Sequence, residues 1–123
     1  DELRLPPSPR SIAEARRFVA HATGGEYAHL SEVACLVVSE LATNAVHYGR
    51  TDYVVCVETL ADRVRVTVQD EGGGVPVRRE PGPAEVRGRG LQIVQALVDS
   101  WGVLPAKGSA GKTVWFELLT ARH

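Results

Sequence analysis

The sequence predicts an α/β (α+β) two-layer sandwich, in which three helices cover one face of a mixed, mostly antiparallel sheet of about five strands. Residues 27–48 carry an apolar stripe with a spacing of four, which is the repeat of one helix face. Residues 53–60 and 63–70 are rich in β-branched side chains and flank an Ala61-Asp62 turn, as in a hairpin. Residues 113–120 alternate in the same way. Amphipathic helices and half-buried strands of this kind bury their apolar surfaces against each other.

The chain begins with a short edge strand and a helix. Leu3 and Leu5 alternate with charged residues, and Pro6-Pro7 ends that strand. Ser11-Ile12-Ala13-Glu14 fits a capping box and predicts a helix from there to about Ala22, with Gly24-Gly25 as its stop. The second helix then runs from about Tyr27 to Tyr48, where Gly49 is suited to a C-cap.

The second strand of the hairpin places a carboxylate on the core side of the sheet. Asp70 falls on the same face as Val64, Val66 and Val68, whereas the opposite, outer face is polar and carries Arg63, Arg65, Thr67 and Gln69. A carboxylate on a buried face is costly unless a donor binds it. Asp70 is therefore either a turn-capping residue or part of a binding site.

The second half of the chain contains several glycine-rich turns. A glycine turn follows Asp70, and residues 77–87 have no hydrophobic period, which predicts a mobile loop. Gly88-Arg89-Gly90-Leu91 opens a third helix that is expected to reach Trp101 and to end at Gly102. Val103-Leu104 is a candidate short strand, and the last strand follows a turn over residues 107–112.

Length and composition indicate a single domain over residues 1–123 and exclude some classes of function. The formal net charge is −1, which gives no electrostatic case for direct nucleic-acid binding or for an anionic membrane surface. No apolar run approaches the roughly 20 residues that span a bilayer, and the start does not resemble a signal peptide. Cys35 and Cys56 are interpreted as buried thiols, and the protein as cytoplasmic.

Four features occur in a fixed order along the chain. They are Glu40 and Asn44 one turn apart on a helix, Asp70-x-Gly72-x-Gly74, Gly88-x-Gly90-Leu91, and Gly111-Lys112-Thr113. Together they resemble the histidine-kinase-like (GHKL, Bergerat) ATPase superfamily over roughly residues 10–120. Within it, the chain looks most like the small stand-alone bacterial ATP-binding proteins of the anti-sigma-factor serine/threonine kinase group.

The resemblance implies ATP and Mg²⁺ as cofactors and gives each feature a role. Asp70 would read the adenine amino group, Asn44 would bind Mg²⁺, and Glu40 would be the catalytic base. The remaining ATP-binding residues implied are Gly72, Gly74, Gly88, Arg89, Gly90, Leu91 and Thr113. Elementary chemistry agrees, because glycines allow close approach, a helix N-terminus favours anions, and Mg²⁺ needs few protein ligands.

Several alternatives stay open at this stage. Glu40 and Asn44 also suit a solvated helix face, and the sequence does not decide whether Lys112 or Thr113 contacts nucleotide. Nor does it decide which of Arg78, Arg79, Arg87 and Arg89 reaches a γ-phosphate.

The preferred function is an anti-sigma factor kinase that phosphorylates a STAS-type anti-anti-sigma partner and also binds a sigma factor. The runner-up is a non-catalytic ATP-dependent switch that acts through partner binding, and a scaffold without nucleotide is the third hypothesis. Homodimerisation through the N-terminal region is known in the family, and the first helix permits it here.

Overall fold

The computed structural model describes residues 1–49, 51–71, 96–105 and 111–120. In chain order its elements are β1 (Glu2–Leu5), α1 (Pro9–Ala22), the 3₁₀ turn η1 (Gly25–Tyr27), α2 (Ala28–Asn44), the π-helical turn η2 (Ala45–Gly49), β2 (Tyr53–Thr59), β3 (Arg63–Asp70), β4 (Ser100–Pro105) and β5 (Lys112–Leu119). No helix within these residues has the length and apolar character needed to cross a membrane.

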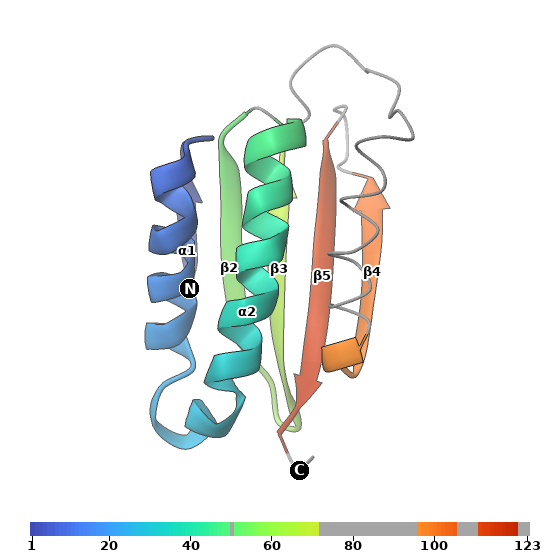
Figure 1. Cartoon of the computed structure of the whole chain (residues 1–123). Helices are drawn as coiled ribbons and strands as arrows, with labels where there is room; N and C mark the ends of the chain where they lie inside the picture. Colours follow the sequence, from blue (N-terminus) through green and yellow to red (C-terminus); the bar gives the residue numbers. More distant parts are fainter. Residues whose placement is uncertain (50, 72–95, 106–110, 121–123) are drawn as a thin grey trace.

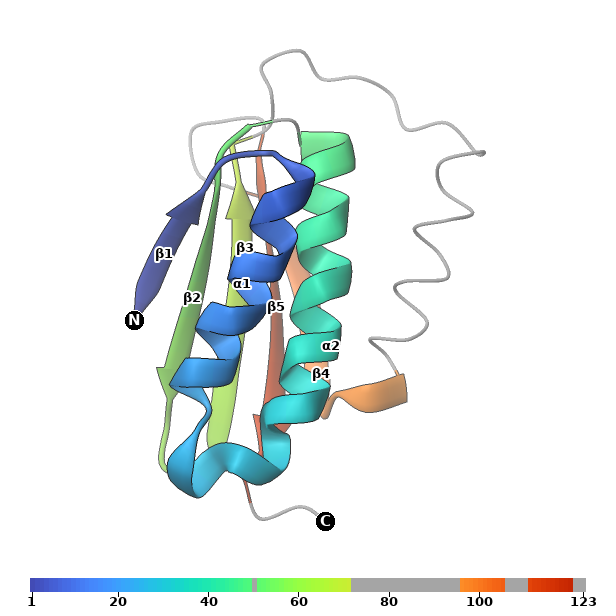
Figure 2. The same cartoon turned by 60° about the vertical axis from the view of Figure 1, so that its left-hand side comes forward.

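The strands form one five-stranded sheet in the order β1-β2-β3-β5-β4. All four strand pairs are antiparallel, so the sheet of the described residues is antiparallel throughout rather than mixed. Helices α1 and α2 lie side by side on the same face of this sheet, as Figures 1 and 2 show. The predicted two-layer architecture is confirmed, while most of the predicted third helix lies outside the described residues.

The core lies between the two helices and the sheet. Along β3, buried residues alternate with more exposed ones from Val64 to Asp70, as the sequence predicted. The cross-strand partners Val57, Val66 and Phe116 are buried in the centre of the sheet. Helix α2 contributes a buried face that includes Val37 and Leu41. This packing fixes which face of β3 meets the helices, and hence where Asp70 points.

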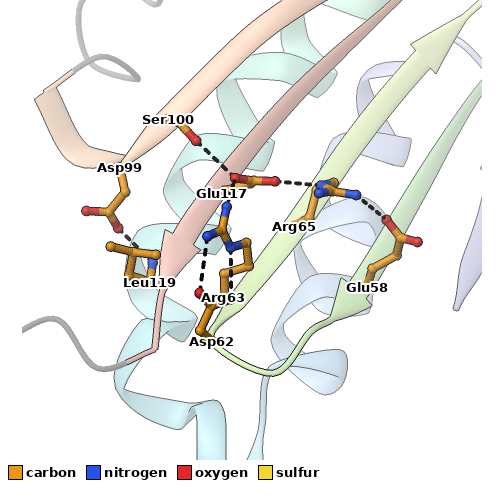
Figure 3. Close-up of polar contacts among 8 residues, drawn as sticks. All are labelled: Glu58, Asp62, Arg63, Arg65, Asp99, Ser100, Glu117 and Leu119. Atoms are coloured by element: carbon orange, nitrogen blue, oxygen red, sulfur yellow. Dashed lines mark hydrogen bonds and ion pairs between the residues drawn. The ribbon is translucent and has the colours of Figure 1, made fainter.

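The outer face of the sheet carries a network of charged side chains at the end remote from Asp70 (Figure 3). Glu117 on β5 is 6% exposed and accepts hydrogen bonds from Arg63 at 2.8 Å and Arg65 at 2.7 Å. Ser100 on β4 donates a further hydrogen bond of 3.1 Å to Glu117. The predicted polar outer face is therefore present, and its arginines join β3 to β5.

The predicted capping box at Ser11 is wrong. Helix α1 begins at Pro9 with Ser8 as its N-cap residue, and Pro9 suits the first helical position because its φ is already helical. Ser11 lies inside the helix and is fully buried. Its hydroxyl donates to the Ser8 carbonyl at 2.7 Å and lies 2.6 Å from the Tyr53 hydroxyl, so it joins the helix to the sheet instead of capping the helix.

The predicted end of the third helix is also wrong, because Trp101 and Gly102 belong to strand β4. Helical structure in this part of the chain ends at Leu97. The Asp99 carboxylate accepts a 2.7 Å hydrogen bond from the Leu119 amide, which fixes the start of β4 beside the end of β5. Trp101 is then paired with Phe116 and packs against the core, so its apolar character suits a strand as well as a helix.

Two smaller differences concern helix α2 and the cysteines. The second helix was expected to reach Tyr48 as a regular α-helix, but α2 ends at Asn44 and continues as the π-helical turn η2. Cys35 and Cys56 are free thiols, as predicted, but both are half-buried rather than buried. Burial raises the pKa of the Cys56 thiol above its usual value.

Candidate functional site

The elements that carry the predicted site residues meet at one end of the sheet. In Figure 1, the C-terminal end of α2, the start of β2 and the start of β5 all lie at the upper end of the molecule. The antiparallel register places the end of β3 there as well, since Asp70 pairs with Tyr53. The turn η2 contacts β3 directly. Glu40 and Asn44, near the end of α2, and the Asp70 carboxylate, at the end of β3, therefore belong to one region.

Asp70 is the most deeply buried of the predicted site residues that the structure describes, with 4% exposure. It faces the helix layer, as its alternation with the valines of β3 predicted. Gln69 pairs with Thr113, so the register continued by one residue brings Asp70 opposite Lys112. The Lys112 ammonium donates a 3.0 Å hydrogen bond to Asp70 Oδ2. Within the described part of the chain, Asp70 Oδ1 has no hydrogen-bond donor.

Gly111 allows the first residue of β5 to come this close to Asp70. A Cβ at position 111 would collide with the Asp70 carbonyl oxygen and lie 2.9 Å from the carbonyl carbons of Asp70 and Glu71. Any other residue would push the start of β5 away from the end of β3. In the sequence, Gly111 belongs to a turn and to the Gly111-Lys112-Thr113 feature, but a contact with a residue about 40 positions earlier is not visible in a local pattern.

The residue after Asp70 is anchored to the edge of the sheet. The Glu71 amide donates a 2.9 Å hydrogen bond to the Thr51 hydroxyl, and Arg4 on β1 donates a 2.8 Å hydrogen bond to the Glu71 carboxylate. That hydrogen bond is the main cause that raises the pKa of Arg4. The Glu71 backbone is therefore held by Thr51, which precedes β2, and its side chain by β1.

Glu40 and Asn44 lie four residues apart near the C-terminal end of α2, and both side chains are half-buried. Residues with this spacing are neighbours on a helix surface. No hydrogen bond or ion pair joins either side chain to another residue in the described ranges. The turn η2 begins directly after Asn44, and π-helical turns often occur at functional sites.

Lys112 and Thr113 point to opposite faces of the sheet. Thr113 pairs with the exposed Gln69 and therefore lies on the outer face, whereas Lys112 lies on the helix side beside Asp70. The structure thus brings Lys112, and not Thr113, next to the carboxylate that was expected to read the base.

The remaining predicted ATP-binding residues lie outside the described residues. They are Gly72, Gly74, Gly88, Arg89, Gly90 and Leu91, and the loop residues Arg78, Arg79 and Arg87 lie outside them too.

The described residues fit an adenine nucleotide with a divalent cation. Asp70 Oδ1 is a buried acceptor that an exocyclic amine can satisfy, and burial without a partner is costly. Asn44 offers a side-chain oxygen, and Mg²⁺ accepts one or two protein ligands with water and phosphate as the others. Arginine or lysine at position 44 would not serve that purpose, whereas a carboxamide does.

Three comparisons relate the chain to known proteins. A family model described as a histidine kinase-like ATPase domain matches residues 5–118. Among solved structures, the chain is similar to the histidine kinase domain of a blue-light activated histidine kinase from Erythrobacter litoralis, with 24% identity and a TM-score of 0.47. That similarity covers 89% of this chain and 59% of the other. The comparison with curated proteins gave no match.

Proposed function

Because the chain belongs to the histidine kinase-like ATPase domain family, we propose that it is an ATP- and Mg²⁺-binding regulatory protein with anti-sigma factor serine/threonine kinase activity. The observation that carries the proposal is the buried Asp70 carboxylate, which lies at the same end of the sheet as the Glu40 and Asn44 helix turn. We take residues 1–123 as a single cytoplasmic ATP-binding domain. Its substrate would be a serine on a STAS-type anti-anti-sigma protein.

Each site residue has a defined task in this proposal. Asp70 accepts a hydrogen bond from the adenine amino group, and Gly72 and Gly74 let the backbone approach the base. Gly88, Arg89, Gly90 and Leu91, which the sequence predicts at the start of a helix, are proposed to hold the phosphates, because free amides at a helix N-terminus favour an anion. Asn44 holds Mg²⁺ through its side-chain oxygen. When bound, ATP with Mg²⁺ supplies the phosphoryl group and neutralises the charge that develops on it.

Glu40 is proposed as the general base. It lies one helical turn before Asn44, and residues at this spacing have Cβ atoms about 5–6 Å apart. A carboxylate so close to the metal ligand can accept the proton of a substrate serine hydroxyl while the hydroxyl oxygen attacks the phosphoryl group. Thr43 and Ser39 donate their hydroxyls to the backbone carbonyls of Ser39 and Cys35, so these neighbours are engaged within the helix.

The first test is ATP binding, measured by calorimetry with and without Mg²⁺. We expect binding by the wild-type protein and a loss of at least 10-fold for Asp70→Asn, because the buried acceptor loses its charge. Asp62→Asn, in the turn at the other end of the hairpin, is the matched control and should bind ATP normally. Absence of ATP binding by the wild-type protein would leave only the scaffold hypothesis.

The second test is phosphoryl transfer from γ-labelled ATP to STAS-type proteins of the same genome. We expect labelled serine on a partner, and loss of that label in Glu40→Gln with ATP affinity kept within about 3-fold. Glu32→Gln, two turns earlier on α2 and exposed, is the control that should keep full transfer.

A non-catalytic switch is the alternative within the same site. It predicts ATP-dependent partner binding that survives Glu40→Gln and no transfer to any partner. Glu40 has no orienting hydrogen bond in the described ranges, which favours testing this alternative in parallel. Size-exclusion chromatography with light scattering would test for the homodimer that the first helix permits.

A further inference from the structure

The ion pair between Lys112 and Asp70 lies where the proposed function puts the adenine base. Lys112 Nζ lies 3.0 Å from Asp70 Oδ2, the Asp70 side chain is 5% exposed, and that of Lys112 is 30% exposed. Two consequences are conceivable. Lys112 either leaves Asp70 when the base arrives, or stays and meets the base as well.

The charges favour a lysine that stays. An adenine amino group is a neutral donor. The free energy gained from one such hydrogen bond to a carboxylate is smaller than the free energy lost when a buried carboxylate is separated from its cationic partner. The partial exposure of Lys112 reduces this difference but does not reverse it, because the Asp70 carboxylate itself is almost fully buried. The pair is therefore expected to persist in the complex.

A persistent pair presents two complementary groups side by side. An ammonium has three N–H donors, and only one is used on Asp70 Oδ2. Among the described residues, neither Lys112 Nζ nor Asp70 Oδ1 has a further partner. The end of the sheet thus offers a donor beside an acceptor, and the Watson–Crick edge of adenine offers the amino donor beside the N1 acceptor.

We propose that Lys112 is a base-reading residue, which donates a hydrogen bond to adenine N1 while Asp70 accepts one from the amino group. The inference rests on the proposed function, since it requires ATP at this site. Gly111 makes the arrangement possible by bringing β5 against the Asp70 backbone, and the strand register selects Lys112 over Thr113.

The experiment combines a variant with a matched change in the nucleotide. Calorimetry is carried out on the wild-type protein and on Lys112→Met, which keeps an apolar stem without the donor. The ligands are ATP, 1-deaza-ATP, in which N1 is replaced by C–H, and 7-deaza-ATP, which keeps the Watson–Crick edge intact. Thermal melts and circular dichroism check that the variant is folded.

We expect Lys112→Met to weaken ATP binding by about 10- to 100-fold, the value of one charge-assisted hydrogen bond. The wild-type protein should lose a similar factor for 1-deaza-ATP, and the variant should lose little more, because both changes remove the same hydrogen bond. For 7-deaza-ATP the variant should lose the same factor as for ATP.

The outcomes separate this inference from the proposed function. ATP binding that is unchanged or tighter in Lys112→Met, or additive losses with 1-deaza-ATP, would overturn the base-reading role while ATP binding by the wild type still supports the function. If the wild-type protein binds no ATP, the proposed function fails first. Should Lys112→Met not fold, Lys112→Leu also removes the donor, and additive losses with 1-deaza-ATP in that variant would equally refute the inference.

Discussion

The hydroxyl groups of Ser11 and Tyr53 lie 2.6 Å apart, and both side chains are fully buried. Ser11 belongs to α1, and Tyr53 is the β2 residue paired with Asp70. The one Ser11 hydroxyl hydrogen is donated to the Ser8 carbonyl, so in this contact the Tyr53 hydroxyl donates and the Ser11 oxygen accepts. This contact connects the first helix to the strand that flanks the candidate site.

Tyr53→Phe should lower the free energy of unfolding by about 1–2 kcal/mol, since it removes one buried hydrogen bond and leaves the ring packing intact. Urea denaturation followed by circular dichroism measures this loss. Tyr27→Phe is the control, because Tyr27 is only half-buried and should change stability less. Equal effects for the two variants would contradict a special role for the Ser11 contact.

Asn44→Ala should remove the part of the ATP affinity that depends on Mg²⁺. ATP binding by the wild-type protein is expected to weaken in EDTA, whereas binding by Asn44→Ala should be weak and nearly equal in Mg²⁺ and EDTA. Calorimetry in both buffers gives the comparison. Thr43→Ala is a neighbouring control, because the Thr43 hydroxyl bonds within the helix to the Ser39 carbonyl at 2.6 Å. A full Mg²⁺ response in Asn44→Ala would assign the metal to another residue.

Gly111→Ala should destabilise the protein by about 1–3 kcal/mol, because the new methyl group meets backbone atoms that cannot move aside. It should also weaken ATP binding, since β5 would shift and take Lys112 with it. Gly24→Ala is the control, because a Cβ there meets its nearest atom at an ordinary 3.5 Å. Thermal melts and calorimetry measure the two effects. A Gly111→Ala variant with unchanged stability and ATP affinity would refute the close approach of Gly111 to the Asp70 backbone.

Glu117→Gln tests the charged network on the outer face. Burial of Glu117 acts to raise its pKa, but hydrogen bonds from Arg65, Arg63 and Ser100 outweigh burial and lower the pKa below its usual value of 4.5. A carboxyl whose folded-state pKa is lowered stabilises the fold above its unfolded-state pKa, and that stabilisation is lost as the pH falls through the folded-state pKa.

We therefore expect Glu117→Gln to lower the free energy of unfolding at pH 7 by about 1–3 kcal/mol. The difference from wild type should shrink as the pH falls below about 4.5, where the wild-type carboxyl takes up a proton. Urea denaturation from pH 3 to pH 7 measures it. Glu58→Gln, whose side chain is 50% exposed, should have a small effect at every pH.

The sequence predicted the parts of the structure that local periodicity decides. Alternation along residues 63–70 was enough to put Asp70 on the helix side, and a spacing of four was enough to put Glu40 beside Asn44. These patterns are decided within a few residues, so no knowledge of the rest of the fold was needed.

The sequence could not predict contacts that depend on register between distant strands. Alternation with the inner-facing Val114 already predicts Thr113 on the opposite face. That Lys112 lies beside Asp70 depends on how β5 pairs with β3, which a glycine-containing turn leaves undetermined. The short apolar run that includes Trp101 suits a helix as well as a strand, and only the pairing of Trp101 with Phe116 shows that it is a strand. The local pattern predicts a cap at Ser11, because its buried partner, Tyr53, is 42 residues away and leaves no mark on that pattern.

The backbone contact at Gly111 also affects how related sequences should be compared. This glycine is required by the carbonyl group of Asp70 and not by a ligand, so selection for folding alone would retain it in homologues that have lost nucleotide binding. A glycine in this column of an alignment would then be a marker of shared architecture. The neighbouring column, occupied by Lys112 here, would be the informative one for sorting homologues by the base that they recognise.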